Sequence, residues 1–260
     1  WDVSSQIEDF TPQTVRSRTL AGLVDAVREG ILPETGFPER LGPALSSVGS
    51  FVCIGQNYAA HAAESGSPSP EFPIVFFKHH AALAGPNDDV VIPPGAQKVD
   101  WEVELAIVIG EPLYRCGSAH DALAAIAGYT ISNDVSERFF QIEKSGGQWS
   151  KGKSFPGFNP LGPFLVPPTE LGNPQDLSLR SWVNDEPRQD SSTSDMIFSV
   201  ADLLVDLSEV MRLEPGDVVN TGTPQGVALS GRFDYLVPGD RVRLAIEGLG
   251  EQEQLFVRTK

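Results

Sequence analysis

Two glutamates separated by one residue are the first feature of the sequence that suggests chemistry. Glu102 and Glu104 lie in the run 100–110, which is apolar after Glu104 and predicts a β-strand. Side chains two positions apart on a strand point the same way, with Cα atoms roughly 7 Å apart. Carboxylates so placed beside a buried run repel each other unless a cation lies between them. The pair is therefore a candidate metal site. The opposite face of the strand is predicted to be apolar and holds Trp101, Val103, Leu105, Ile107 and Ile109.

A third carboxylate, Asp134, follows a predicted strand over residues 128–133, at a point where a helix is expected to begin. Taken alone, Asp134 has the residue type of a helix N-cap. Taken with Glu102 and Glu104, it completes a set of three carboxylates without histidine, the hard oxygen donors that suit Mg²⁺ or Mn²⁺. Local spacing leaves both interpretations open.

A histidine and a glutamate form the second candidate group. If Asn57 begins a short helix, His61 and Glu64 lie at positions i and i+3 on one helix face. The carboxylate can then orient the imidazole and stabilise its charge while it takes a proton from water. A solvated surface pair remains the alternative for these two residues.

Residues 147–154 match the phosphate-binding pattern G-x-x-x-x-G-K-[ST]. That pattern binds nucleotides when it joins a strand to a helix. Here a helical segment precedes it, and Pro156 and Pro160 follow it and oppose a helix. We therefore reject nucleotide binding and keep Lys151 and Lys153 as cations close in sequence to Asp134.

A strand that enters a turn rich in Gly and Pro covers residues 215–227. A structural turn is its simplest interpretation. The alternative is that Thr221 and Thr223, with exposed backbone amides, bind a carboxylate.

Composition limits the classes of function. The chain has 260 residues, 40% of them hydrophobic, and a net charge of -16, which argues against nucleic acid and anionic membranes as partners. Its two cysteines, Cys53 and Cys116, support neither a disulfide framework nor a cysteine zinc site. No apolar run approaches the roughly 18 residues of a membrane span, and the first residues lack a signal pattern. Because the first residues also lack an initiator Met, we expect a few leading residues to be missing. We also expect a cytoplasmic enzyme.

Strand patterns outnumber helix patterns and do not alternate regularly with them, which predicts a β-rich α+β fold. Residues 1–50 are expected to form a small N-terminal subdomain and residues 51–260 the main domain. Helices are predicted at 19–28, 57–64, 118–126, 137–144 and 199–211. Strands are predicted at 51–54, 74–77, 89–92, 101–109, 129–132, 163–166 and 217–220, with a hairpin at 240–257.

These segments, in this order, resemble the fumarylacetoacetate hydrolase family from about Phe51 to about Val257. The residues that carry the resemblance are Gly55, Asn57, Tyr58, His61 and Glu64; Gly85-Pro86-Asn87-Asp88; Asp100-Trp101-Glu102-Val103-Glu104-Leu105; Asn133-Asp134-Val135-Ser136 with Arg138 and Gln141; Gly152-Lys153-Ser154-Phe155; and Pro215-Gly216-Asp217 with Thr221-Gly222-Thr223-Pro224 and Gly226-Val227. One departure is Lys78-His79-His80, where many members have Lys-Pro-Pro.

The resemblance implies a mixed β-sandwich or rolled β-barrel and a homodimer. It implies one Mg²⁺ or Mn²⁺ per subunit, held by Glu102, Glu104 and Asp134. It also implies that His61 and Glu64 activate water, that Lys153 takes part in catalysis, and that Arg138, Gln141 and Thr223 contact the substrate.

The chemistry expected from the resemblance is hydrolysis of a C–C bond in a 2,4-diketo acid, giving pyruvate and a carboxylic acid by way of a metal-bound enolate. Acylpyruvates and diketo-deoxy sugar acids are the substrate classes considered. Because the same enolate serves other reactions, oxaloacetate decarboxylation and isomerisation of a 2-hydroxy-diene-dioate remain alternatives. A non-catalytic metal-binding protein is a third interpretation, opposed by the presence of both His61 and Glu64.

Overall fold

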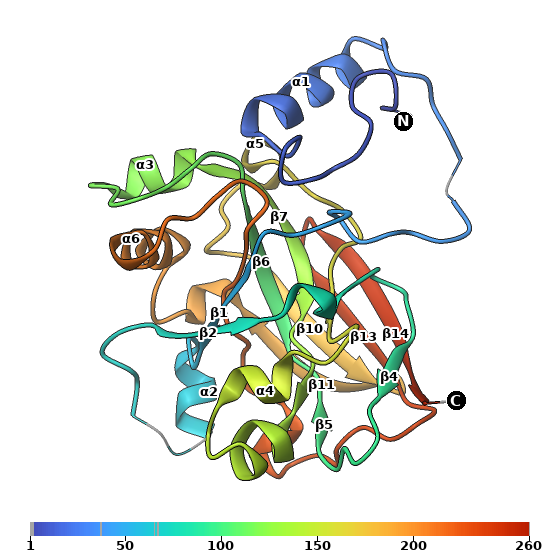
Figure 1. Cartoon of the computed structure of the whole chain (residues 1–260), viewed down its shortest axis with the longest axis vertical. Helices are drawn as coiled ribbons and strands as arrows, with labels where there is room; N and C mark the ends of the chain where they lie inside the picture. The colour runs from blue at the N-terminus through green and yellow to red at the C-terminus, as the bar shows by residue number, and fades with distance from the viewer. Residues whose placement is uncertain (1–2, 37, 65, 67, 260) are drawn as a thin grey trace.

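The computed structural model describes residues 3–36, 38–64, 66 and 68–259. Two five-stranded sheets form the centre of the molecule, and short helices lie around them (Figure 1). The first sheet has the order β2 (Ile74–Lys78), β1 (Phe51–Gly55), β12 (Val218–Asn220), β6 (Val103–Ile109) and β7 (Ile126–Asn133). The second has the order β11 (Glu186–Ser192), β10 (Ser178–Val183), β13 (Arg241–Ile246), β14 (Gly250–Arg258) and β4 (Val90–Ile92). Two small ladders pair β3 (Leu83–Ala84) with β9 (Asn159–Pro160) and β5 (Val99–Asp100) with β8 (Ser136–Glu137).

Both large sheets are mixed. In the first sheet β1 runs parallel to β12, and in the second β14 runs parallel to β4, while the other neighbours are antiparallel. Strands β6 and β7 pack against β10, β13 and β14, so the two sheets face each other. The described strands form no closed barrel, and the β-rich α+β prediction is confirmed as a layered mixed fold.

Alternation along β6 places its two faces in different hydrophobic clusters, as a period of two requires. Val103, Leu105 and Ile107 belong to the cluster between the two sheets. Ala106 and Val108 belong to a second cluster on the opposite face. The predicted division of this strand into two faces is therefore confirmed, but both faces are buried.

The N-terminal segment covers that second face. Leu20 and Leu23, on α1 (Ser17–Arg28), share a hydrophobic cluster with Phe51 and Ala106 of the first sheet. Figure 1 shows α1 at one end of the molecule, beyond the ends of β6 and β7. The division at residue 50 stays a prediction, and residues 1, 2 and 37 lie outside the described part.

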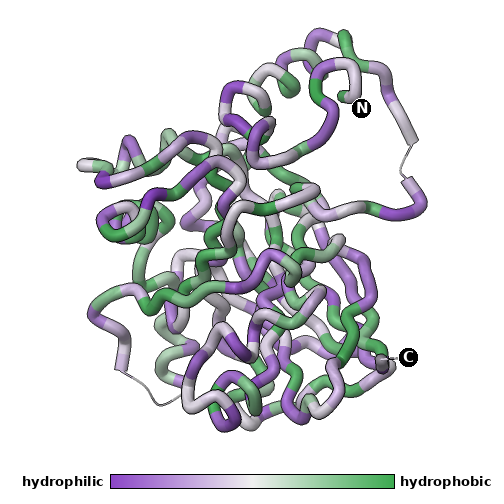
Figure 2. Tube along the Cα trace, in the orientation of Figure 1, coloured by the Kyte–Doolittle hydropathy of each residue, from purple (hydrophilic) through white to green (hydrophobic). Residues whose placement is uncertain are grey.

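The remaining helices are short. They are α2 (Ala59–Glu64), α3 (Ala119–Ala124), α4 (Trp149–Lys153), α5 (Pro168–Leu171) and α6 (Val200–Val210), together with the π-helix η2 (Phe139–Lys144) and the 3₁₀ turns η1 (His80–Ala82), η3 (Thr193–Asp195) and η4 (Ala228–Ser230). Helix α6 begins at a capping box between Ser199 and Asp202. Hydrophobic and hydrophilic residues alternate around its coil in Figure 2, and its apolar side packs against the core and against α3. Within the described residues, none of the helices combines the length and hydropathy needed to cross a membrane.

Several predicted elements differ from those observed. No α-helix begins at Asp134; the chain instead forms β8 and then η2, which starts at Phe139. Segment 163–166 is not a strand and contributes one isolated bridge, from Val166 to Tyr129. The hairpin of β10 and β11 was not predicted, and neither was α4, which lies inside the segment that matches the nucleotide-binding pattern.

Candidate metal and catalytic site

The three predicted metal-ligand residues lie together. Glu102, Glu104 and Asp134 each offer a carboxylate oxygen, and these oxygens are all within 4.8 Å of one another. The antiparallel ladder of β6 and β7 explains the proximity, because Val103 pairs with Asn133 and Asp134 N donates to Glu102 O at 3.0 Å. All three side chains are buried, so the arrangement concentrates negative charge in the interior of the protein.

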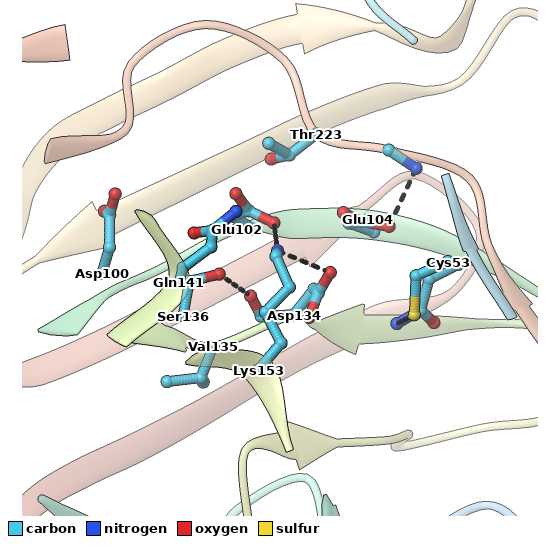
Figure 3. Close-up of polar contacts among 12 residues, drawn as sticks. Cys53, Asp100, Glu102, Glu104, Asp134, Val135, Ser136, Gln141, Lys153 and Thr223 are labelled. Atoms are coloured by element: carbon cyan, nitrogen blue, oxygen red, sulfur yellow. Dashed lines mark hydrogen bonds and ion pairs between the residues drawn. The ribbon is translucent and has the colours of Figure 1, made fainter. Parts of the chain in front are cut away.

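Two lysines contact different carboxylate oxygens of Asp134. Lys153 Nζ lies 2.6 Å from Glu102 Oε2 and 2.8 Å from Asp134 Oδ2, and Figure 3 shows it between these two carboxylates. Lys78 Nζ lies 2.5 Å from Asp134 Oδ1 and also donates to the carbonyl of Phe158. Asp134 therefore holds a buried double ion pair and is not a helix N-cap.

Arg138 pairs with the carboxylates at the other end of the site. Its guanidinium donates to Glu102 Oε1 at 2.6 Å and to Asp100 Oδ2 at 2.8 Å. Asp100 is held in turn by the backbone N–H groups of Trp101, Ala228 and Leu229. This chain of contacts fixes Arg138 against Glu102, the residue that directly precedes β6.

The two glutamates differ in electrostatic environment. Burial alone would raise the pKa of Glu102, but Lys153 and Arg138 lower it to about 2. Burial raises the pKa of Glu104 well above its ordinary range, and the charges of Asp134 and Glu102 raise it further. Gly222 N donates to Glu104 Oε2 at 2.8 Å, and Gly222 has φ +98° with Asn57 close by, a position suited to glycine.

These residues fit a divalent cation. The donors are hard carboxylate oxygens, and the carboxylate with the raised pKa, Glu104, has a single hydrogen-bond donor among the described residues. A cation at this point would favour ionised Glu104, as expected for a ligand.

His61 and Glu64 both lie on α2, as the spacing predicts. His61 Nδ1 is 3.9 Å from Glu64 Oε2, which is an ion-pair distance but beyond hydrogen-bond range. Glu64 is fixed by Gly226 N at 3.0 Å and by Arg232 at 3.0 Å. Burial lowers the pKa of His61, although the nearby charge of Glu102 opposes this. Burial at this position therefore favours the neutral imidazole.

One cavity brings most of these groups together. It has a volume of about 160 Å³, and its lining includes seven predicted site residues: His61, Glu102, Glu104, Arg138, Gln141, Lys153 and Thr223. Asp134 and Glu64 lie behind the lining, where they contact Lys153 and His61 respectively. The rest of the lining is mostly apolar and comes from β1, β2, η2, α4 and η4.

Gln141 and Thr223 are oriented by neighbours. Gln141 Oε1 accepts from Arg138 at 2.9 Å, which turns its amide NH₂ away from that guanidinium. The Thr223 hydroxyl donates to Val103 O at 3.0 Å and accepts from Gln189 at 2.8 Å. Both residues are buried and line the cavity. Figure 3 shows their side chains near Glu102.

Sequence reasoning missed three residues that shape the site. Asp100 pairs with Arg138, and Lys78 pairs with Asp134; the side chains of Asp100 and Lys78 are fully buried. Their positions in segments compared with the family motifs were the signal that could have identified them. Trp149 forms a cavity wall: a Cβ atom at Gly55 would lie 2.2 Å from its ring. Nothing in local sequence marks Trp149, because its contact with Gly55 joins segments far apart in the chain.

Comparisons with known proteins show the family to which the chain belongs. The sequence model described as fumarylacetoacetate (FAA) hydrolase C-terminal matches residues 50–257. A protein of Burkholderia multivorans, named only as a proposed hydrolase, is 46% identical over 256 residues, which are 98% of this chain and 90% of that protein.

Solved structures show the same relationship. Fumarylacetoacetate hydrolase from Exiguobacterium antarcticum is 32% identical, with a TM-score of 0.85 over 100% of this chain and 92% of that one. A 2-hydroxyhepta-2,4-diene-1,7-dioate isomerase from Mycobacterium marinum is 40% identical, with a TM-score of 0.72 over 84% of this chain and 77% of that one. The chain belongs to the fumarylacetoacetate hydrolase family, a family of enzymes that generally bind a divalent metal.

Proposed function

We propose that the protein hydrolyses a C–C bond in a 2,4-diketo acid and releases pyruvate and a carboxylic acid. The observation that carries the proposal is the single cavity into which His61, Lys153 and the carboxylates Glu102 and Glu104 all project. A base, a cation and a metal-binding group are the three elements that this reaction needs.

We propose that Glu102, Glu104 and Asp134 hold one Mg²⁺ or Mn²⁺ ion. When bound, this ion would act as a Lewis acid toward the carboxylate and 2-oxo oxygens of the substrate and stabilise the negative charge of an enolate. Their buried position and hard oxygen donors support this assignment.

His61 is the proposed general base. Its Nδ1 faces Glu64, so the other ring nitrogen is available to take a proton from water as the water oxygen attacks the 4-carbonyl carbon. Glu64 stabilises the imidazolium that results. When the bond between C3 and C4 breaks, its electron pair stays on C3, and the proton on His61 returns to that carbon.

Lys153 and Gln141 are the proposed partners of the oxyanion that forms at C4. Lys153 Nζ donates to two carboxylates and lies 4.9 Å from the Phe76 ring, on a wall of the cavity. Its ammonium has three donors, so one remains for the substrate. Arg138 and Thr223, which line the same cavity as Lys153 and Gln141, are also proposed to contact the substrate.

Isomerisation of a 2-hydroxy-diene-dioate is the second candidate. It is favoured by the names of two structural relatives, the isomerase from Mycobacterium marinum and a 5-carboxymethyl-2-hydroxymuconate delta-isomerase from Mycobacterium smegmatis, which is 39% identical. In that reaction the 2-hydroxy diene becomes a 2-oxo alkene: the hydroxyl group loses its proton, a carbon atom gains one, and no water is consumed.

A substrate panel with product analysis separates the candidates. Acylpyruvates, a diketo-deoxy sugar acid, oxaloacetate and an unsaturated 2-hydroxy diacid would each be incubated with the protein and Mg²⁺ or Mn²⁺. We expect pyruvate and a carboxylic acid in equal amounts from an acylpyruvate. Turnover of the diacid alone, without pyruvate, would favour the isomerase.

We also propose that the protein forms a homodimer in the cytoplasm and that residues 1–50 form a separate small subdomain.

A further inference from the structure

The buried charges of the site form one connected network. Its carboxylates are Asp100, Glu102, Glu104 and Asp134, and its cations are Lys78, Arg138 and Lys153. Each of the three cations is already within 2.8 Å of at least one of these carboxylates. An incoming anion therefore meets cations whose charge is largely balanced.

The balance of this network limits the charge of the substrate. With all four carboxylates ionised, the negative groups exceed the three cations by one. A divalent ion held by the triad reverses the sign and leaves one net positive charge. One substrate carboxylate neutralises that charge, whereas a second would find no further cation in the cavity to pair with.

The other described residues that line the cavity offer no cation to pair with a second substrate carboxylate. Apart from Arg138 and Lys153, none of the described lining residues is Lys or Arg. His61 also lines the cavity, but its burial favours the neutral imidazole. A second carboxylate would therefore meet no unpaired Lys or Arg among the described lining residues.

Aromatic and aliphatic side chains form the apolar part of the cavity lining. Trp149 packs edge-on against Phe76 with ring centroids 5.5 Å apart, and both rings line the cavity beside Gly55. Ile142 and Leu229 also line it, and they remain 43% and 36% exposed, so hydrophobic side chains lie where the cavity reaches solvent. A volume of about 160 Å³ is below the ~300 Å³ at which typical ligand pockets begin, which suits a small molecule.

We infer that the site selects 2-oxo acids that carry a single carboxylate and a short uncharged tail, and that it discriminates against 2-oxo dicarboxylates. The inference rests on the proposed function, since it takes the divalent ion and the 2-oxo acid from it. It adds the substrate class, and it disfavours both the diene-dioate and oxaloacetate as substrates.

Binding of two inert 2-oxo acids tests the inference without relying on turnover. 2-Oxopentanoate and 2-oxoglutarate have the same five-carbon chain and differ by one terminal carboxylate, and neither has a 4-oxo group to be attacked. Calorimetric titration of the Mg²⁺-loaded protein should show 2-oxopentanoate binding at least about tenfold more tightly. Equal or tighter binding of 2-oxoglutarate would overturn the inference and leave the proposed function standing.

Variants at Ile142 test the electrostatic explanation. Ile142→Lys adds a cation at the exposed part of the lining and should shift the preference toward 2-oxoglutarate by about tenfold. Ile142→Gln, of similar length but neutral, and Val210→Lys, at a 77% exposed position on α6, should leave the preference unchanged. Equal effects of Lys and Gln at position 142 would contradict the charge argument. If neither acid binds with Mg²⁺ or Mn²⁺, the proposed function fails as well.

Discussion

Lys78 Nζ lies 2.5 Å from Asp134 Oδ1, and both side chains are fully buried. The contact joins the end of β2 to the turn after β7, so a strand at the edge of the first sheet positions a candidate metal ligand. Asp134 also pairs with Lys153, and it is the only member of the acidic triad that contacts two lysines in the described structure.

Lys78→Met should destabilise the protein, most strongly without metal. Removing one partner of a buried ion pair costs about 3–5 kcal/mol, and Lys153 would still offset part of the charge on Asp134. We expect the free energy of unfolding to fall by about 3 kcal/mol in EDTA and by less in saturating MgCl₂, where a cation would replace the lost charge. Urea denaturation in both buffers measures this.

The matched control is His80→Met, an exposed position two residues away, which should change stability little in either buffer. An equal loss for Lys78→Met with and without Mg²⁺ would argue against a cation site at Asp134.

Glu104→Gln should weaken metal binding and, in contrast, stabilise the metal-free protein. The carboxylate is buried among like charges that raise its pKa, so its ionised form opposes folding of the metal-free protein. Because its folded pKa is raised, this penalty develops as the pH rises above the ordinary value of Glu. The neutral amide should therefore stabilise the metal-free protein at pH about 7 while weakening Mn²⁺ binding by at least about 100-fold. Calorimetric Mn²⁺ titration and urea denaturation give the two values, and a variant that binds Mn²⁺ as the parent does would exclude Glu104 as a ligand.

Much of this site could be predicted from sequence because its residues follow strand and helix periods. The pair Glu102 and Glu104, and the spacing of His61 and Glu64, are local patterns that fold as expected. The motifs also named Asp134, Arg138, Gln141, Lys153 and Thr223, and the structure brings these residues together at one site.

Features that depend on long-range contacts were not predictable in the same way. The hairpin of β10 and β11 buries Ser181 and Gln189, which hydrogen-bond to each other and connect to Thr223. Such polar strand residues look solvent-exposed until their partners are known. The burial of Lys78 is similar, because its partners lie 56 and 80 positions away.

His61→Ala should slow hydrolysis and leave the metal bound. His61 lies 3.9 Å from Glu64, which is not a member of the acidic triad, so Mn²⁺ affinity should stay within about twofold of the parent value. Loss of a general base typically lowers kcat by 10²- to 10⁴-fold, and we expect about 10³. Steady-state kinetics with acetylpyruvate and a parallel Mn²⁺ titration test both statements.

The control is Arg232→Met, which removes an exposed partner of Glu64 and should lower kcat by less than about threefold. Unchanged kcat for His61→Ala would remove it from the mechanism.

The pH dependence of kcat/KM should report the lowered pKa of His61. Burial favours the neutral imidazole, so the base stays active below its ordinary pKa of about 6.5. The acidic limb should therefore have its midpoint below pH about 6.5, and a bound divalent cation would lower it further. Because the unfolded chain protonates His61 first as pH falls, the same shift removes stability below about pH 6.5. An acidic limb with its midpoint above pH 7 would contradict the neutral, buried base.

Hydrolysis of acetylpyruvate in water enriched in ¹⁸O tests the central claim most directly. With Mg²⁺ present, the account predicts pyruvate and acetate in equal amounts, with one ¹⁸O atom from water in each acetate, because the water oxygen becomes part of the new carboxylate. Product ratios from NMR and isotope content from mass spectrometry give the answer. Protein that binds Mn²⁺ but leaves acetylpyruvate intact, or acetate formed without ¹⁸O, would contradict C–C bond hydrolysis at this site.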